Sequence, residues 1–148
     1  MLFRSEAINQ SIQNYAPDNS RSQIIRKGTN TIILDAYNAN PTSMEAALKN
    51  FSEMAGKKKI VFLGQMAELG EESELEHKRI VTQLAGYRFD TVILVGKNFS
   101  GLAGEIAATC FENSSEAAGW AKDQSFSEAT ILIKGSRSSR MELVLDGL

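Results

Sequence analysis

Polar side chains that could hold a nucleotide or a substrate gather in the stretch LDAYNANP, at residues 34–41. The Asp35 carboxylate can accept hydrogen bonds from a ribose diol, and the Tyr37 ring can stack on a base. The amides of Asn38 and Asn40 can both donate and accept. The spacing alone leaves a second interpretation equally open, in which Asn40 only caps a helix and the other residues form a loop.

A second group of candidates lies in FLGQMAELGEESELEH. Gly64 and Gly70 bracket a short loop in which backbone can approach a ligand closely, and Glu68 could pair there with a substrate ammonium. The glutamates that follow Gly70 are better explained as a solvated helix start, because the helix dipole favours negative charge at that end.

A third group lies in LIKGSRSSRME. An apolar run ends at Lys134, Gly135 leaves room for close approach, and Ser136 is predicted to begin a helix beside Arg137 and Arg140. Cations next to a helix N-terminus suit a carboxylate or a phosphate. A plain basic surface turn is the less favoured alternative, because positive charge opposes the helix dipole at this end.

Other candidates favour ordinary structural roles. VGKNFSG, around Gly96 and Lys97, lacks the phosphate-binding loop pattern and is predicted to be a turn. His77, the only histidine, lies on an apolar helix face and is expected to pack or cap rather than to bind a metal or act as a base. Cys110 is expected to be a small core residue, and the sequence has no zinc-binding cluster and no Ser-His-Asp pattern with a nucleophile elbow.

The elements that position these residues alternate along the chain. Runs rich in Val, Ile and Leu alternate with helical patterns, which predicts an α/β domain: a Rossmann-like, mainly parallel sheet with helices on both faces and one antiparallel strand near the N-terminus. In such sheets ligands bind at the carboxyl ends of the strands, where all three groups of candidates lie. Strands are expected at QIIRKG, TIILDAY, KIVFLG, DTVILVG, ATCF and ATILIKG, and helices at about 41–55, 73–87, 100–107, 114–123 and 138–146.

Two of these helices carry recognisable starts. Asn40 with Pro41 predicts an N-cap followed by the first helical residue, and Ser73 with Glu76 predicts a capping box for the next helix.

Composition limits the classes of function. The chain has 148 residues, 43% of them hydrophobic, which suits one domain with its own core. Its net charge of −2 gives no basic field for nucleic acid or anionic lipid, and no apolar run approaches the roughly 18 residues of a membrane span. A single cysteine rules out an intramolecular disulfide. We expect a cytoplasmic monomer without membrane insertion.

Three segments together resemble a known family. DAYNANPTSM, LGQMAELGEESELEH and IKGSRSSRME, in this order and each after a predicted strand, resemble the C-terminal domain of the Mur ligases. Within that family, the segments look like those of the member that joins D-alanyl-D-alanine to UDP-N-acetylmuramoyl-tripeptide in peptidoglycan synthesis. DNSRSQ, at residues 18–23, is similar to the family's linker after its ATPase domain. The resemblance implies that 1–15 form the last helix of that central domain and 16–148 the C-terminal domain.

The resemblance also implies a mechanism. ATP phosphorylates the substrate carboxylate, the amine of the incoming dipeptide attacks the acyl phosphate, and the C-terminal domain closes over ATP and Mg²⁺ held by the central domain. Arg21 and Asp35 would meet the phosphates and ribose, while Tyr37, Asn38 and Asn40 would line the adenine and substrate side.

The dipeptide would lie between the other two loops. By the same resemblance the loop around Glu68 and the turn formed by Lys134, Gly135, Ser136 and Arg137 would cradle it. We infer that its ammonium would lie near Glu68 and its carboxylate near Arg137.

The sequence departs from the family pattern in two places. Ser138-Ser139 replaces the more usual Gly-Met-type pair, and Gln65 stands where an acidic residue is common. The chain also has neither a phosphate-binding loop nor the family's magnesium ligands, so we expect it to be inactive alone. The alternative is a free-standing Rossmann-like module that binds a nucleotide or a partner without catalysis.

Overall fold

The computed structural model describes residues 22–148. The predicted helix at 1–15, most of the linker and Arg21 therefore lie outside the described residues. The strands are β1 (Gln23–Lys27), β2 (Asn30–Asp35), β3 (Lys59–Gly64), β4 (Thr91–Val95), β5 (Thr109–Phe111) and β6 (Thr130–Lys134), and the α-helices are α2 (Pro41–Glu53), α3 (Ser73–Ala85) and α4 (Ser114–Gln124).

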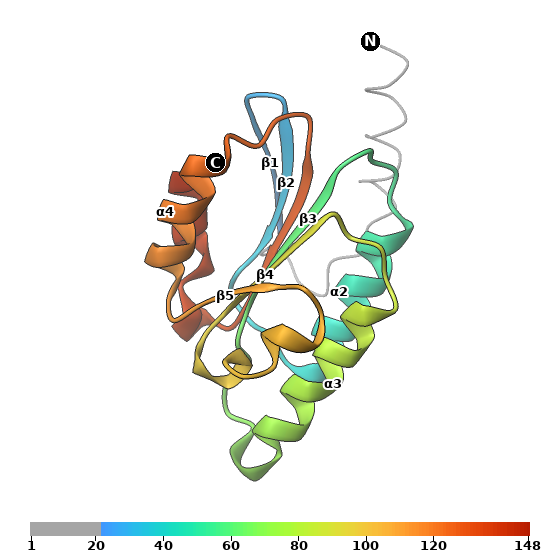
Figure 1. The fold of residues 1–148 in the computed structure, drawn as a ribbon, viewed down its shortest axis with the longest axis vertical. Coiled ribbons are helices and arrows are strands. Elements are labelled where there is room, and N and C mark those ends of the chain that lie inside the picture. The colour runs from blue at the N-terminus through green and yellow to red at the C-terminus, as the bar shows by residue number, and fades with distance from the viewer. Residues whose placement is uncertain (1–21) are drawn as a thin grey trace.

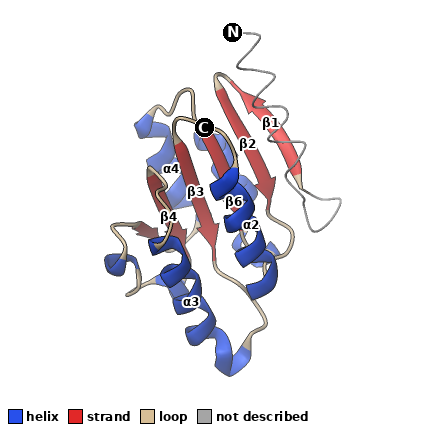
Figure 2. Ribbon diagram, turned by 90° about the vertical axis from the view of Figure 1, so that its right-hand side faces the viewer, coloured by secondary structure: helices blue, strands red, loops and turns tan. Residues whose placement is uncertain are grey.

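The strands form one six-stranded sheet in the order β1-β2-β6-β3-β4-β5. β1 runs antiparallel to β2 across a tight turn, in which Gly28 has a φ of 63°. The pairs from β2 to β5 are all parallel. Helices α2 and α3 cover one face, and α4 covers the other together with a C-terminal 3-10 segment, Met141–Gly147 (Figures 1 and 2). The predicted fold class is confirmed.

The central strands β2, β3 and β6 are largely apolar because both of their faces are buried, whereas the edge strand β1 is mostly exposed. In β2, Ile33 packs into the cluster beneath α2 and α3, whereas Ile32 and Leu34 pack into the cluster beneath α4. Side chains alternate between the two faces of a strand, so a strand covered by helices on both sides is typically a nearly continuous apolar run.

Helix α2 begins as its sequence predicts. Asn40 Oδ1 accepts the N–H of Ser43 at 2.8 Å, and Ser43 Oγ accepts the N–H of Asn40 at 3.1 Å, which completes a capping box. Pro41 occupies the first helical position, where its missing N–H costs nothing. The buried stripe of this helix consists of Met44, Ala47, Leu48 and Phe51.

Three predictions about helices are wrong. No side chain caps α3, because a 3-10 turn at Gly70–Glu72 leads straight into it. The helices predicted at 100–107 and 138–146 are 3-10 segments, interrupted by left-handed backbone at Gly101 (φ 84°) and Arg140 (φ 50°).

No helix within the described residues has both the length and the hydropathy of a membrane span.

Candidate functional site

Three strands bring the sequence-predicted residues to one edge of the sheet. β6 lies between β2 and β3, and its last residue, Lys134, is in register with Asp35 on one side and Leu63 on the other. The loops that follow these strands therefore start side by side, although they lie far apart in the sequence. Carboxyl ends of parallel strands are where open α/β sheets bind ligands.

A buried ion pair forms the floor of this edge. Lys134 Nζ lies 2.7 Å from Asp35 Oδ2, and the side chains are 1% and 2% exposed. The same ammonium donates to the backbone oxygen of Asn38 at 3.2 Å, which ties the loop after β2 to β6. Asp35 Oδ1 is also buried and has no hydrogen-bond partner among residues 22–148. The two groups expected to face ligands thus face each other.

An exposed pair lies in the loops that follow these strands. The Arg137 guanidinium lies 5.3 Å from the centre of the Tyr37 ring, a cation–π distance, and Tyr37 is 38% exposed. The guanidinium makes no hydrogen bond or ion pair to another described residue. A guanidinium stacked on an aromatic ring keeps its N–H groups free to bind a carboxylate or a phosphate in two-point fashion.

The turn that carries Arg137 is held from inside. A Cβ at Gly135 would lie 2.6 Å from Met141 Cγ and 2.9 Å from Gly64 Cα, so the space beside this glycine is filled by the protein. Ser136 is 4% exposed and donates its N–H to the backbone oxygen of Gln65 at 3.2 Å. Gly135 and Ser136 thus support the turn from within.

The predicted helix after Ser136 is wrong. Arg137–Ser139 is one 3-10 turn, and it ends at the left-handed Arg140. A single turn has almost no macrodipole, so the argument for an anion site at a helix N-terminus does not apply here. The charge of Arg137 itself remains available.

The other predicted site residues lie near this edge without joining the pair. Asn38 and Asn40 are exposed, but Asn40 uses its side-chain oxygen in the helix cap. Glu68 is exposed in the loop between β3 and α3, with a left-handed φ of 60°, and its carboxylate contacts no other described residue through a hydrogen bond or ion pair.

His77 is a packed histidine, as predicted. It is 0% exposed, and its Nε2 accepts the N–H of Met66 at 2.9 Å. Nδ1 lies 2.7 Å from the backbone oxygen of Ser73. The ring packs edge-on against Phe99, with the two ring centres 4.9 Å apart. Burial lowers the pKa of His77, although the Ser73 carbonyl and Glu76 act in the opposite direction. Its role in holding the loop after β3 has no signature in the sequence.

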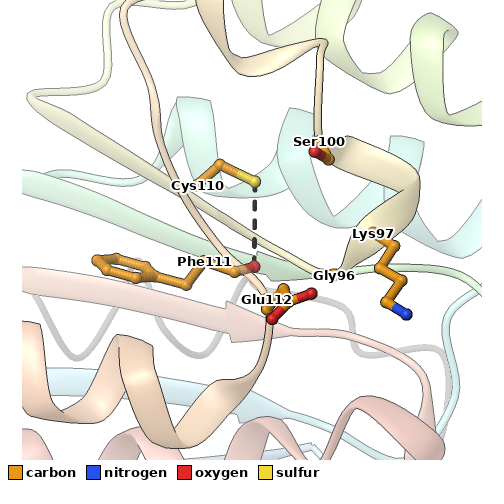
Figure 3. A pocket seen from close by; sticks show the side chains of 6 residues that line it. All are labelled: Gly96, Lys97, Ser100, Cys110, Phe111 and Glu112. Atoms are coloured by element: carbon orange, nitrogen blue, oxygen red, sulfur yellow. Dashed lines mark hydrogen bonds between the residues drawn. The ribbon is translucent and has the colours of Figure 1, made fainter.

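Sequence reasoning also missed a pocket beside β4 and β5. It has a volume of about 470 Å³ and is lined by Gly96, Lys97, Ser100, Cys110, Phe111 and Glu112 (Figure 3). Cys110 packs only partly against the core and also lines this pocket, so its prediction as a simple core residue is incomplete. Burial raises the pKa of its thiol, which disfavours the reactive thiolate.

Within residues 22–148, no group of three or more His, Cys, Asp or Glu side chains is placed to hold a metal ion. Four of the predicted site residues are exposed at this edge within the described part of the chain: Arg137, Tyr37, Asn38 and Glu68.

Comparison with known proteins identifies relatives of the whole domain. The family model for the Mur ligase, glutamate ligase domain matches residues 20–137. A UDP-N-acetylmuramoyl-tripeptide--D-alanyl-D-alanine ligase from Escherichia coli (strain K12) is 34% identical, over 97% of this chain and 32% of its own length. The ligase of the same name from Rickettsia prowazekii (strain Madrid E) is 32% identical, over 85% of this chain and 29% of its own.

Solved structures give the same result. MurF from Acinetobacter baumannii superposes with a TM-score of 0.74 at 30% identity, covering 88% of this chain and 30% of that one. MurF ligase from Thermotoga maritima, solved in complex with ADP, shares the fold with a TM-score of 0.70 at 24% identity, over 84% of this chain and 29% of that one. The chain spans about 30% of the length of these relatives.

Proposed function

Since this chain belongs to the Mur ligase family, we propose that it is the C-terminal domain of an ATP-dependent ligase that adds D-alanyl-D-alanine to UDP-N-acetylmuramoyl-tripeptide. Support comes from the curated relatives, which carry this activity in their names. Because the chain spans about 30% of their length, we assign the complete reaction to a longer protein. In that protein, residues 16–148 would form this domain and residues 1–15 the end of the preceding one.

The observation that carries the proposal is the meeting of the motif loops at one edge. The Asp35–Lys134 pair is buried below, and the Arg137–Tyr37 pair is exposed above. A buried, paired lysine and aspartate form a rigid floor, whereas an exposed guanidinium with free N–H groups can bind an anion. This division of roles suits a domain that closes over substrates held by another part of the enzyme.

For the dipeptide, we place the carboxylate at Arg137 and the ammonium at Glu68. Both side chains are exposed and have opposite charge, and neither forms an ion pair with another described residue. Lys134, Gly135 and Ser136 would support the turn that carries Arg137, rather than touch the dipeptide, because all three are buried. Electrostatic complementarity to both ends of a zwitterion would select the substrate's orientation.

For ATP, we place the contact on the loop after β2. Tyr37 and Asn38 are exposed there, and Asp35 Oδ1 is a buried acceptor without a hydrogen-bond partner in the described part of the chain. A ribose hydroxyl could supply that bond if the backbone above Asp35 shifts on binding. ATP would supply the phosphoryl group that activates the tripeptide carboxylate. Arg21 would contact its phosphates, and Mg²⁺ would be held by the rest of the enzyme.

The cellular setting follows from this function. We propose that the protein acts as a monomer in the cytoplasm. Its UDP-linked precursor and ATP would both be substrates there. The free-standing binding module is disfavoured, because the family match covers residues 20–137.

The test is to change the two ends of the dipeptide site in the complete ligase. We expect Arg137→Ala to raise the KM for D-alanyl-D-alanine by about tenfold or more, and Arg137→Lys to recover little because a lysine cannot form the two-point contact. Glu68→Gln should also raise this KM. Arg140→Ala, which removes a neighbouring exposed arginine, is the matched control. Unchanged dipeptide KM in both the Arg137 and Glu68 variants would refute the placement.

A further inference from the structure

A buried histidine lies beneath the loop that joins β3 to α3. Nδ1 of His77 lies 2.7 Å from the backbone oxygen of Ser73, and Nε2 lies 2.9 Å from the N–H of Met66. A carbonyl can only accept and a backbone N–H can only donate, so the proton is on Nδ1 and Nε2 is bare. The surrounding backbone thus selects one neutral tautomer.

The ring connects three segments of the chain. The first is the loop at Met66, and the second is the start of α3. The third is the 3-10 turn Lys97–Phe99, whose Phe99 meets the ring edge-on at 77°. Asn98 reinforces this junction, because its N–H donates to Gln65 Oε1 at 3.2 Å and its amide donates to Ser73 Oγ at 2.8 Å.

This junction continues into the dipeptide site on both sides of Met66. On one side, the backbone oxygen of Gln65 accepts from the N–H of Ser136 and from Ser139 Oγ, at 3.2 and 3.1 Å. These bonds hold the turn that carries Arg137. On the other side, Glu68 has a left-handed backbone that a residue with a side chain adopts only when its surroundings impose it.

We propose that His77 is a positioning residue for dipeptide recognition. Its neutral imidazole anchors the loop at Met66, and that loop presents Glu68 and, through Gln65, supports the turn of Arg137. The ligand roles of Glu68 and Arg137 rest on the proposed function, whereas the anchoring of the loop rests on the hydrogen bonds alone.

The test compares one replacement that keeps a hydrogen-bond acceptor with one that removes it. In His77→Gln, the amide oxygen can still accept the Met66 N–H, whereas His77→Leu fills similar volume without an acceptor. In the complete ligase, His77→Leu should raise the KM for D-alanyl-D-alanine about tenfold, the effect of one lost hydrogen bond. The KM for ATP should stay within about twofold, and His77→Gln should recover most of the dipeptide KM.

Val81→Ala is the matched control for a general loss of packing. Val81 is 1% exposed and lies one turn further along α3, in the hydrophobic core. It should lower the thermal midpoint while leaving both KM values near those of the unchanged protein. If His77→Leu changes the dipeptide KM no more than Val81→Ala does, His77 has only a packing role and the proposal is overturned.

Nitrogen NMR separates this proposal from the proposed function. At neutral pH the His77 spectrum should be that of a neutral ring protonated on Nδ1, and the Met66 amide should exchange slowly with solvent. That protection should disappear in His77→Leu and return in His77→Gln. A ring protonated on Nε2, or a Met66 amide equally protected in all three proteins, would overturn the anchoring role whether or not the enzyme ligates D-alanyl-D-alanine.

Discussion

Asp35 and Lys134 show how single residues acquire their roles from their neighbours. Each ends a strand with a charged side chain, which at the sequence level suggests contact with a ligand. They are 99 positions apart and become adjacent because β6 lies beside β2. The order of strands across a sheet is set by tertiary packing, so this pairing could not be predicted from the local sequence.

The buried pair should be sensitive to loss of one partner. We expect Lys134→Met to lower the free energy of unfolding by about 3–5 kcal/mol, because it leaves the Asp35 carboxylate buried without its counter-ion. Adding Asp35→Leu to this variant should restore part of the loss. Urea denaturation of the two variants measures both values. If the free energy of unfolding of Lys134→Met lies within about 1 kcal/mol of that of the unchanged protein, Asp35 must find water or another partner.

At the scale of elements, the strands and the α-helices are predicted best. All six strands, helices α2, α3 and α4, and the cap at Asn40 agree with their patterns, because apolar runs and capping residues are local signals. The 3-10 segments do not agree with the predicted helices. The left-handed backbone at Arg140 could not be predicted, because such a conformation is usually indicated in a sequence by a glycine. The rule that ligands bind at the carboxyl ends of parallel strands correctly predicted that the three loops meet at one edge. It did not predict which side chains contact each other there.

Asn40 distinguishes a capping role from a ligand role. Asn40→Ala should cost about 1 kcal/mol of stability, because the N–H of Ser43 loses its acceptor. It should leave the KM for ATP unchanged, since the side chain is already used in the cap. Thermal denaturation and ligation kinetics measure the two effects, with exposed Asn38→Ala as the comparison. A large rise in the ATP KM with little loss of stability would restore Asn40 to the nucleotide site.

Gly135 is a test of packing between elements. A methyl group there would meet both Met141 and the backbone of Gly64, and backbone cannot move aside as a side chain can. We expect Gly135→Ala to destabilise the protein by about 1–3 kcal/mol, as overpacked sites do. Combining it with Met141→Ala should relieve only the part of the steric clash that involves Met141. Equal stability of Gly135→Ala and the unchanged protein would show that β3 and β6 separate easily at this edge.

At the scale of the whole molecule, stability should depend on pH through His77. Burial places its folded-state pKa below the ordinary value of 6.5. The folded protein therefore binds fewer protons than the unfolded chain below about pH 6.5, and unfolding becomes easier as the pH falls. The contribution is complete above pH 6.5 and is lost as the pH falls through the folded-state pKa.

Denaturation at pH 7.5 and pH 5 measures this dependence. The unchanged protein should lose more stability between the two pH values than His77→Gln does, because glutamine does not titrate. Parallel losses in the two proteins would assign the pH dependence to the carboxylates instead.

The whole domain is proposed to close over substrates that another part of the enzyme holds. The most direct test is product formation by the complete ligase, followed by mass spectrometry with UDP-N-acetylmuramoyl-tripeptide, ATP, Mg²⁺ and D-alanyl-D-alanine. We predict a product whose mass exceeds that of UDP-N-acetylmuramoyl-tripeptide by one dipeptide less one water, with one ADP released per amide bond formed. The yield should be much smaller with Arg137→Ala. A product formed from a single amino acid in place of the dipeptide, or no ATP-dependent product, would contradict the assignment.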